Sequence, residues 1–479
     1  MTENEPSAPP TAPLRFHGGL AGALAPFALF IGGVAWLALA GAPDERGFWP
    51  VLIAAMTLGL VLAKDRTAYS EALISGMSQP IVMIMIVAWL LAGLLGVLMT
   101  RSGFVGSLIF IAGEAGVSGG AYVAASFLIC CLISTSTGTS LGTILICGPL
   151  LYPPGGALGA DPMVLMGAIV GGATFGDNVS PISDTTIASA LTQEADIGGV
   201  VRSRLRYALL AAAIALVLYV GLGSGTRIDA GGPAIEGDPG ALPMVLAPLL
   251  VVVLLLRRRH LVEGLLTGIV AALGLGLALR LIEPSELMTI DRDAFGARGL
   301  LLEGLERGVG ASIFTLLLMG LVGALEATGV LDRMVEAARS RTRSARGAEA
   351  WIVATLMAVM LLITHTTVAI LTVGRFTRET GRRFGISAYR RANLLDATGV
   401  TLPFILPYMI PVILAASATA DGVAFGMPRL SPAQAGILNF HSWAMLAVMV
   451  MAVVTGWGRG PLEEVDADET ARTRAEHVP

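Results

Sequence analysis

Two aspartates stand in a short polar stretch that interrupts otherwise apolar sequence. The run GGATFGDNVSPISDTTIASA, residues 171–190, contains Asp177 and Asp184. Pro181 lacks the N–H that a helix requires, and the glycines before Asp177 loosen the chain, so the run predicts a helix that breaks near 176–180 and restarts. Carboxylates, hydroxyls and free carbonyl oxygens at such a break are hard ligands that suit a small cation.

Each aspartate also has a purely structural interpretation. If Ser180 is the N-cap of the restarted helix, Asp184 lies in its first turn, where the helix dipole stabilises an acid by ~0.3–1 kcal/mol. Asp177 would then be a turn-former at a membrane boundary. An aspartate near the centre of a bilayer costs at least ~2.5 kcal/mol and usually marks an ion or proton path, which favours the functional interpretation.

The composition is that of a membrane protein. The chain of 479 residues is 54% hydrophobic and 14% charged, against roughly 25% charged residues in soluble domains. Residues 115–160 contain no Asp, Glu, Lys or Arg, and several apolar windows reach the ~20 residues that a spanning helix needs. The polar ends 1–19 and 459–479 are expected to be disordered tails.

The distribution of arginine and lysine predicts how the chain crosses the membrane, because short cytoplasmic loops are rich in both residues. Basic clusters are expected on the cytoplasmic side at 64–66, 202–206, 257–259, 338–346 and 375–391. The acidic loop 225–242 is expected outside. Both termini then lie in the cytoplasm, and the protein is expected in the plasma membrane, which is the inner membrane of a bacterial cell.

Three short similarities suggest an internal repeat. The segments beginning at 93, 133 and 173 resemble those beginning at 320, 363 and 397, at intervals of 227, 230 and 224 residues. Chance similarity between small-residue packing motifs is the alternative. Apolar segments 120–151 and 350–374 are expected to be re-entrant hairpins, because each should return to the side from which it enters.

The predicted fold is therefore an all-α polytopic membrane protein made of two inverted repeats, 20–224 and 243–458. Each repeat would contain about five spanning helices and one re-entrant hairpin, with broken helices at the midplane. This is the architecture of secondary transporters.

Further polar residues are candidates for the same site. Thr137, Thr139 and Ser140 would line a cavity from the tip of the first hairpin, unless their hydroxyls satisfy the backbone of their own helix. His365 lies in the corresponding segment of the second half, where it is either a buried, satisfied histidine or a proton carrier. Asp396 is the acid of the second repeat.

The residues around both motifs resemble the NhaC family of sodium/proton antiporters. The family pattern G-A-x-F-G-D-x-x-S-P-x-S-D-T-T is matched within 172–186, and T-G-T-S-x-G-T within 137–143. A weaker match spans 394–403. Family members often carry lysine where this chain has Asn178, and the effect of this difference on ion stoichiometry or substrate stays open.

The resemblance implies an Na⁺/H⁺ antiporter that works by alternating access, with Na⁺ or H⁺ bound competitively by Asp177 and Asp184 and no cofactor. The alternative is an Na⁺- or H⁺-coupled carrier or exchanger of a small organic solute. An intramembrane aspartyl protease is disfavoured, because the two acids are only seven residues apart, so no enzymatic activity is expected. The expected partners are the lipid bilayer and a small cation or small organic solute, and no nucleic acid is expected to bind. Whether the protein forms a homodimer stays open. The candidate binding residues are Thr137, Thr139, Ser140, Asp177, Asn178, Ser180, Ser183, Asp184, Thr185, Thr366 and Asp396, with Asp177, Asp184 and His365 as candidates for proton coupling.

Overall fold

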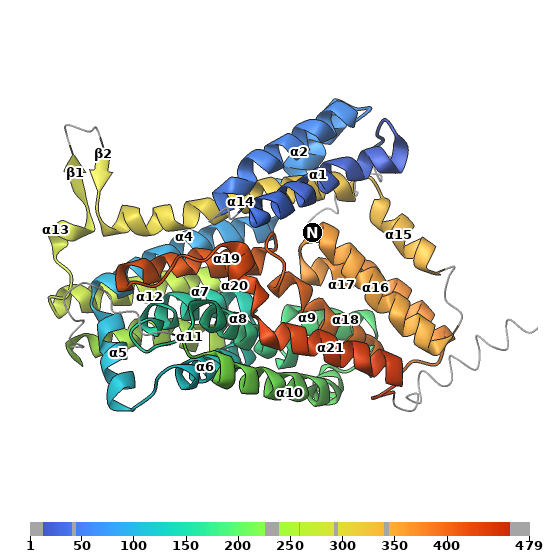
Figure 1. The fold of residues 1–479 in the computed structure, drawn as a ribbon. Coiled ribbons are helices and arrows are strands. Elements are labelled where there is room, and N and C mark those ends of the chain that lie inside the picture. The colour runs from blue at the N-terminus through green and yellow to red at the C-terminus, as the bar shows by residue number, and fades with distance from the viewer. Residues whose placement is uncertain are drawn as a thin grey trace, which may run out of the picture.

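The computed structural model describes residues 13–40, 45–225, 239–257, 259–291, 296–339 and 344–459, and these residues are predominantly helical (Figure 1). Eight of the described helices are long and apolar enough to cross a membrane. The protein is therefore a multi-pass membrane protein. Residues 1–12, 226–238 and 460–479, which hold most of the expected tails and external loop, lie outside the described residues.

The described residues of the first half of the chain form ten α-helices. They are α1 (Gly19–Leu39), α2 (Phe48–Leu62), α3 (Arg66–Met77), α4 (Pro80–Arg101), α5 (Phe104–Glu114), α6 (Gly120–Thr137), α7 (Ser140–Leu151), α8 (Pro162–Val179), α9 (Asp184–Thr192) and α10 (Ile197–Leu222), with the 3₁₀ turns η1 (Glu45–Gly47) and η2 (Pro153–Gly155).

The second half contains the remaining helices and one small hairpin of strands. They are η3 (Pro239–Val245), α11 (Leu246–Leu256), α12 (Leu261–Ala278), α13 (Pro284–Leu287), β1 (Thr289–Asp291), β2 (Gly296–Arg298), α14 (Leu300–Glu326), α15 (Val330–Arg339), α16 (Ala345–Ile363), α17 (Thr366–Arg383), α18 (Ala388–Gly399), η4 (Leu402–Phe404), α19 (Ile410–Ala418), η5 (Thr419–Phe425), α20 (Pro432–Ile437) and α21 (Phe440–Thr455). The two strands pair antiparallel, with Ile290 opposite Ala297.

The order of elements repeats along the chain at a constant interval. Helices α5, α7, α8 and α9 begin at residues 104, 140, 162 and 184, and α15, α17, α18 and α19 begin at 330, 366, 388 and 410. Each pair of starts is 226 residues apart. The interval of 230 expected for the two hairpin segments is wrong, because the threonines in both segments align equally well at more than one spacing. The structure instead pairs Gly138 with Thr364.

Helix α10 shows from which end each hairpin enters the protein. In the first half of α10, Tyr207 accepts a hydrogen bond from Arg390 of α18 at 2.9 Å, and Arg390 also donates to Glu349 near the start of α16 at 2.9 Å. Just beyond the far end of α10, Ser224 accepts a hydrogen bond from the N–H of Gly120, the first residue of α6, at 3.0 Å. The hairpins α6–α7 and α16–α17 therefore enter from opposite ends of α10.

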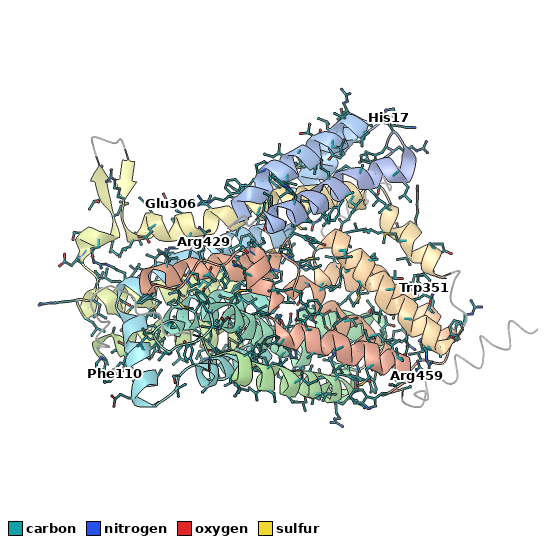
Figure 2. The ribbon with its side chains drawn as sticks, viewed as in Figure 1. His17, Phe110, Glu306, Trp351, Arg429 and Arg459 are labelled. Carbon is teal, nitrogen blue, oxygen red and sulfur yellow. The ribbon has the colours of Figure 1, made fainter. Side chains whose placement is uncertain are left out.

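The same two ends are visible in the whole molecule. Figure 2 shows Trp351 and Arg459 toward one end and Phe110 and Glu306 toward the other. The end of the molecule where α10 begins is called the cytoplasmic end, and the end where α10 finishes is called the outer end. These names follow the orientation predicted from the arginines.

Helices α4 and α14 pack closely beside the hairpins, because small residues let their backbones approach. A Cβ atom placed on Gly304 of α14 would lie 2.5 Å from the Cα of Leu94, and one placed on Gly308 would lie 2.7 Å from the backbone N of Leu90. Since Gly304 precedes Gly308 while Leu94 follows Leu90, the two helices run antiparallel. Neither glycine therefore tolerates a side chain without a shift of the helices.

Part of each expected tail is packed against the helices. Leu14 donates its N–H to the carbonyl of Ala327 at 2.8 Å, and Phe16 is buried with its ring edge-on to Tyr69. Arg459 donates to Glu349 at 2.8 Å. Both segments are held by a side chain that contacts the helices. Phe16 packs in an apolar cluster with Tyr69, and the guanidinium of Arg459 pairs with Glu349.

Candidate functional site

The chain breaks between α8 and α9, where the glycines and Pro181 predicted a break. Helix α8 ends at Val179, and α9 begins at Asp184. The predicted N-cap at Ser180 is wrong: Ser183 is the N-cap, so Asp184 is the first residue of α9 and not the end of its first turn. The reason is a turn, in which the N–H of Ser183 donates to the carbonyl of Ser180 at 3.4 Å and delays the restart.

A second break forms the tip of each hairpin. After α6, Gly138 adopts a left-handed conformation with φ +70°, and Thr139 is extended and caps α7 by accepting the N–H of Gly142 at 3.2 Å. After α16, Thr364 adopts φ +60° and His365 is extended. Glycine adopts this left-handed conformation at no steric cost, whereas a β-branched residue such as Thr364 is strained there.

Asp177 lies in the last turn of α8 and is only 4% exposed. One of its carboxylate oxygens accepts the hydroxyl of Ser140, the first residue of α7, at 2.7 Å, and the other accepts the hydroxyl of Ser183 at 2.6 Å. Among the described residues no arginine or lysine forms an ion pair with it. The hairpin tip and the broken helix thus hold this acid by neutral donors alone.

Asp184 lies on the other side of the break and is exposed. Its carboxylate accepts a hydrogen bond from the hydroxyl of Thr367, in the first turn of α17. The two hairpins therefore meet the same broken helix, one at each of its acids.

A cavity of about 70 Å³ lies between these elements. The first half contributes the polar side chains Ser140, Asp177, Asp184 and Thr185, and the second hairpin contributes residues 364–367. The remaining wall is apolar and consists of Met85, Leu141, Pro403, Phe404, Ile410 and Pro411. His365 contributes an Nδ1 atom that is buried without a hydrogen-bond partner.

The lining follows the 226-residue interval. Ser140, Asp177, Asp184 and Thr185 correspond to Thr366, Pro403, Ile410 and Pro411, and all eight line the cavity. One half of the pseudo-symmetric cavity therefore supplies both acids, while the equivalent positions of the other half are apolar or carry a hydroxyl.

Asp396 does not line the cavity. It is fully buried in an ion pair with Arg204 of α10, and it accepts the hydroxyl of Thr186 at 2.9 Å. Arg204 also donates to the backbone carbonyl of Asn178 at 2.7 Å and to the side chain of Asn393 at 3.1 Å. This cluster ties both sides of the α8–α9 break to α18.

The remaining candidate residues lie near the cavity but are not part of its lining. Thr137 donates to the carbonyl of Ile133 at 2.8 Å, so its hydroxyl satisfies its own helix, and the hydroxyl of Thr139 is used as the cap described above. The side-chain oxygen and nitrogen of Asn178 are buried without partners. Ser180 and Ser183 are fully buried in the turn between the two helices.

Sequence reasoning missed Arg204, which was grouped with its neighbours as a loop arginine. A signal was present in the spacing: residues 202 and 206 share one face of a helix, whereas 204 points to the opposite face. That face continues through Ala208, Ala211 and Ala215, all fully buried. An arginine in a stripe of buried alanines requires a buried partner.

The fold and the cavity define a multi-pass membrane protein in which two hairpins and a broken helix converge on buried acids. Residues 46–224 match the sequence model of the Na⁺/H⁺ antiporter family.

Several curated proteins with similar sequences are named as antiporters. The Na⁺/H⁺ antiporter NhaC of Alkalihalophilus pseudofirmus is 33% identical over 46% of this chain and 50% of the relative. The malate-2H⁺/Na⁺-lactate antiporter of Bacillus subtilis is 28% identical over 61% of this chain and 65% of the relative. The Na⁺/H⁺ antiporter NhaC of Bacillus subtilis is 26% identical over 60% and 68%. The chain thus covers half to about two thirds of the length of these relatives.

Proposed function

We propose that this protein is a secondary active transporter of the plasma membrane that exchanges Na⁺ for H⁺. The observation that carries the proposal is the environment of Asp177, a buried carboxylate held by two hydroxyls without a cationic partner among the described residues. A buried charge is costly unless it is paired. Asp177 should therefore hold either a proton or a cation, and the competition between them couples the two fluxes.

The cavity favours a small cation as the partner of Asp177. Its lining includes two acids, and no lysine or arginine among the described residues. Its volume of about 70 Å³ corresponds to roughly two water molecules. A carboxylate anion would be repelled by the acids, whereas Na⁺ finds carboxylate and hydroxyl oxygens there. We assign Na⁺ binding to Asp177 and Asp184, with hydroxyls from Ser140, Ser183, Thr185 and Thr366.

Alternating access is the mechanism that fits the arrangement of the two halves. The 226-residue interval and the opposite directions of the two hairpins support two inverted repeats, 20–224 and 243–458. In this proposal one repeat moves against the other around the cavity, so that the acids face the cytoplasm and the outside in turn. Both termini would lie in the cytoplasm.

A coupled exchange of a small organic solute is the second candidate. The observation that favours it is the apolar wall formed by Pro403, Phe404, Ile410 and Pro411, which could contact hydrocarbon. One of the relatives is named for malate and lactate exchange. This function requires the cavity to enlarge in another conformation.

Reconstitution into proteoliposomes that contain a pH-sensitive dye separates the two functions. We expect an inward Na⁺ gradient to raise the internal pH, and K⁺ or choline at the same concentration to cause no change. Li⁺, lactate, malate and amino acids are then added in turn, with protein-free liposomes as the control. If Na⁺ alone moves no protons but an organic solute together with Na⁺ does, the second candidate replaces the first.

A further inference from the structure

A second cavity lies along the same seam as the first. It is about 30 Å³ in volume and is lined by residues of α4, α7, α14 and α19, and by Asp421 of η5. Three of these helices, α4, α7 and α19, also line the cavity at the acids.

On each of these three helices, a residue that lines the first cavity is followed, within one to two turns, by a residue that lines the second cavity. On α4 the lining passes from Met85 to Trp89, and on α7 it passes from Leu141 to Leu145. On α19 it passes from Ile410 to Leu414. Since a helix turn contains 3.6 residues, all three steps advance along one face. The two cavities are therefore successive parts of one seam.

The direction of the seam follows from the ends of these helices. Helix α7 runs from the hairpin tip at Ser140 back toward the outer end, where the hydroxyl of Tyr122, in the first turn of α6, donates to the carbonyl of Leu151 at 2.7 Å. The second cavity lies nearer than the acids to the outer end of α7, because it includes Leu145 and Pro149.

An ion pair crosses the seam at the second cavity. Arg307 of α14 pairs with Asp421, which is 4% exposed, and Arg307 also donates to Glu303 at 2.8 Å. A Cβ atom on Gly96 of α4 would lie 2.9 Å from a carboxylate oxygen of Asp421, so this carboxylate rests directly on the backbone of α4. The pair thus joins α14 to the segment after α19, across α4.

We propose that this seam is the outer half of the transport path and that Arg307 and Asp421 close it. The proposal rests on the proposed function only in taking the cavity at Asp177 as the place from which a substrate leaves. Asp421 holds Arg307 while the path is closed; when an arriving cation or proton neutralises Asp421, Arg307 is released and α19 separates from α4 and α14. The ion pair itself joins two elements of the second repeat, α14 and η5. The contact of Asp421 with Gly96 of α4 lies between the two repeats, where alternating access requires a mobile contact.

Thiol labelling tests this path without reference to the transported ion. In a chain with Cys130, Cys131 and Cys147 replaced by alanine, Leu145→Cys places one thiol in the second cavity. We expect a membrane-impermeant thiol reagent added outside to label it slowly, and at least about five times faster when Asp421→Asn is added. Glu303→Gln is the matched control, because it removes the exposed partner of Arg307 and should leave the rate unchanged. Equal labelling rates with and without Asp421→Asn would overturn the proposal.

A cross-link provides a test that leaves the ion pair intact. Ala92→Cys and Ala418→Cys place one thiol on α4 and one on α19, at positions that both line the second cavity. A short cleavable bis-thiol reagent should join them and stop exchange, and cleavage by a reductant should restore it. Undiminished exchange in fully cross-linked protein contradicts a moving seam. If the wild type exchanges no Na⁺, the proposed function fails, yet the labelling rates still decide whether the seam opens.

Discussion

The guanidinium of Arg204 and the carboxylate of Asp396 form an ion pair in which neither side chain has exposed surface. Removing one partner of such a pair leaves an uncompensated buried charge and costs about 3–5 kcal/mol. We therefore expect Arg204→Ala to lower the melting temperature of the purified protein strongly. The exposed neighbour Arg202→Ala is the control and should change stability by less than about 0.5 kcal/mol. Similar melting temperatures for both variants would show that the pair contributes little to the fold.

A pH-dependent contact occurs at the cytoplasmic end, where Asp196 caps α10. The hydrogen bond from the hydroxyl of Tyr389 lowers the pKa of Asp196, and the backbone N–H of Gly199 lowers it further. Because the folded pKa lies below the unfolded value of about 3.9, the stabilisation is present above that value and is lost as pH falls through the folded pKa. Tyr389→Phe should reduce thermal stability by a constant amount between pH 5 and 9, and by less below pH 4. A stability difference that varies between pH 5 and 9 would show that another group titrates.

The break at the acids was predictable because its signals are local. Proline and glycine act on their own backbone, so Pro181 and the glycines before Asp177 indicate an interruption whatever surrounds them. The position of the restart was not predictable, because Ser180 and Ser183 are both suitable caps. In the structure a turn from Ser180 to Ser183 delays the restart, and the hydroxyl of Ser183 then donates to Asp177 on the preceding helix.

Long-range pairing limited the prediction of the site. Asp396 was expected in the cavity as the acid of the second half, but its partner Arg204 stands 192 residues earlier, and nothing in the intervening sequence indicates that the two meet. Thr137 and Thr139 had two interpretations for a similar reason. Whether a hydroxyl faces a cavity or its own helix depends on the rotation of that helix, which the packing of α6 against α8 decides.

The strained tip of the second hairpin yields a prediction about stability. Thr364 adopts φ +60°, a conformation that costs a residue with a Cβ roughly 1–2 kcal/mol. Thr364→Gly should remove this strain and raise the melting temperature. The free energy of unfolding should rise by about 1 kcal/mol once the greater freedom of glycine in the unfolded chain is included. Thr366→Gly, two residues later at the start of α17, should lower it. If Thr364→Gly is the less stable of the two variants, the tip is not strained.

Asp184 and Thr367 should tune the apparent affinity for Na⁺. Asp184 is exposed, so water screens its charge, and its carboxylate accepts a hydrogen bond from the Thr367 hydroxyl. We expect Thr367→Val to weaken apparent Na⁺ affinity by about five-fold, corresponding to about 1 kcal/mol for one hydrogen bond. The measurement is the Na⁺ dependence of proton flux in proteoliposomes. Thr372→Val is the control, because that hydroxyl donates to the carbonyl of Val368 within α17. An equal shift in both variants would indicate a general effect on the helix.

Asp177→Asn should abolish Na⁺-driven proton movement while the protein stays folded. Asparagine has the same shape, and its carbonyl oxygen can still accept one of the hydroxyls of Ser140 and Ser183, while the other hydroxyl can turn to accept from its amide. The variant therefore retains the hairpin contact but cannot bind or release a proton. Asp161→Asn is the matched control: Asp161 caps the start of the same helix, accepting the N–H of Val164 at 2.9 Å, and asparagine caps equally well.

The experiment measures proton flux from proteoliposomes on an imposed Na⁺ gradient, using variants that are monodisperse and melt within a few degrees of the wild type. We expect Asp161→Asn to exchange at the wild-type rate and Asp177→Asn to be indistinguishable from protein-free liposomes. Residual exchange in Asp177→Asn would place the coupling proton elsewhere. Asp184 and His365, which line the same cavity, would then be tested before Asp396, because the buried pair with Arg204 leaves Asp396 outside the cavity and already compensated.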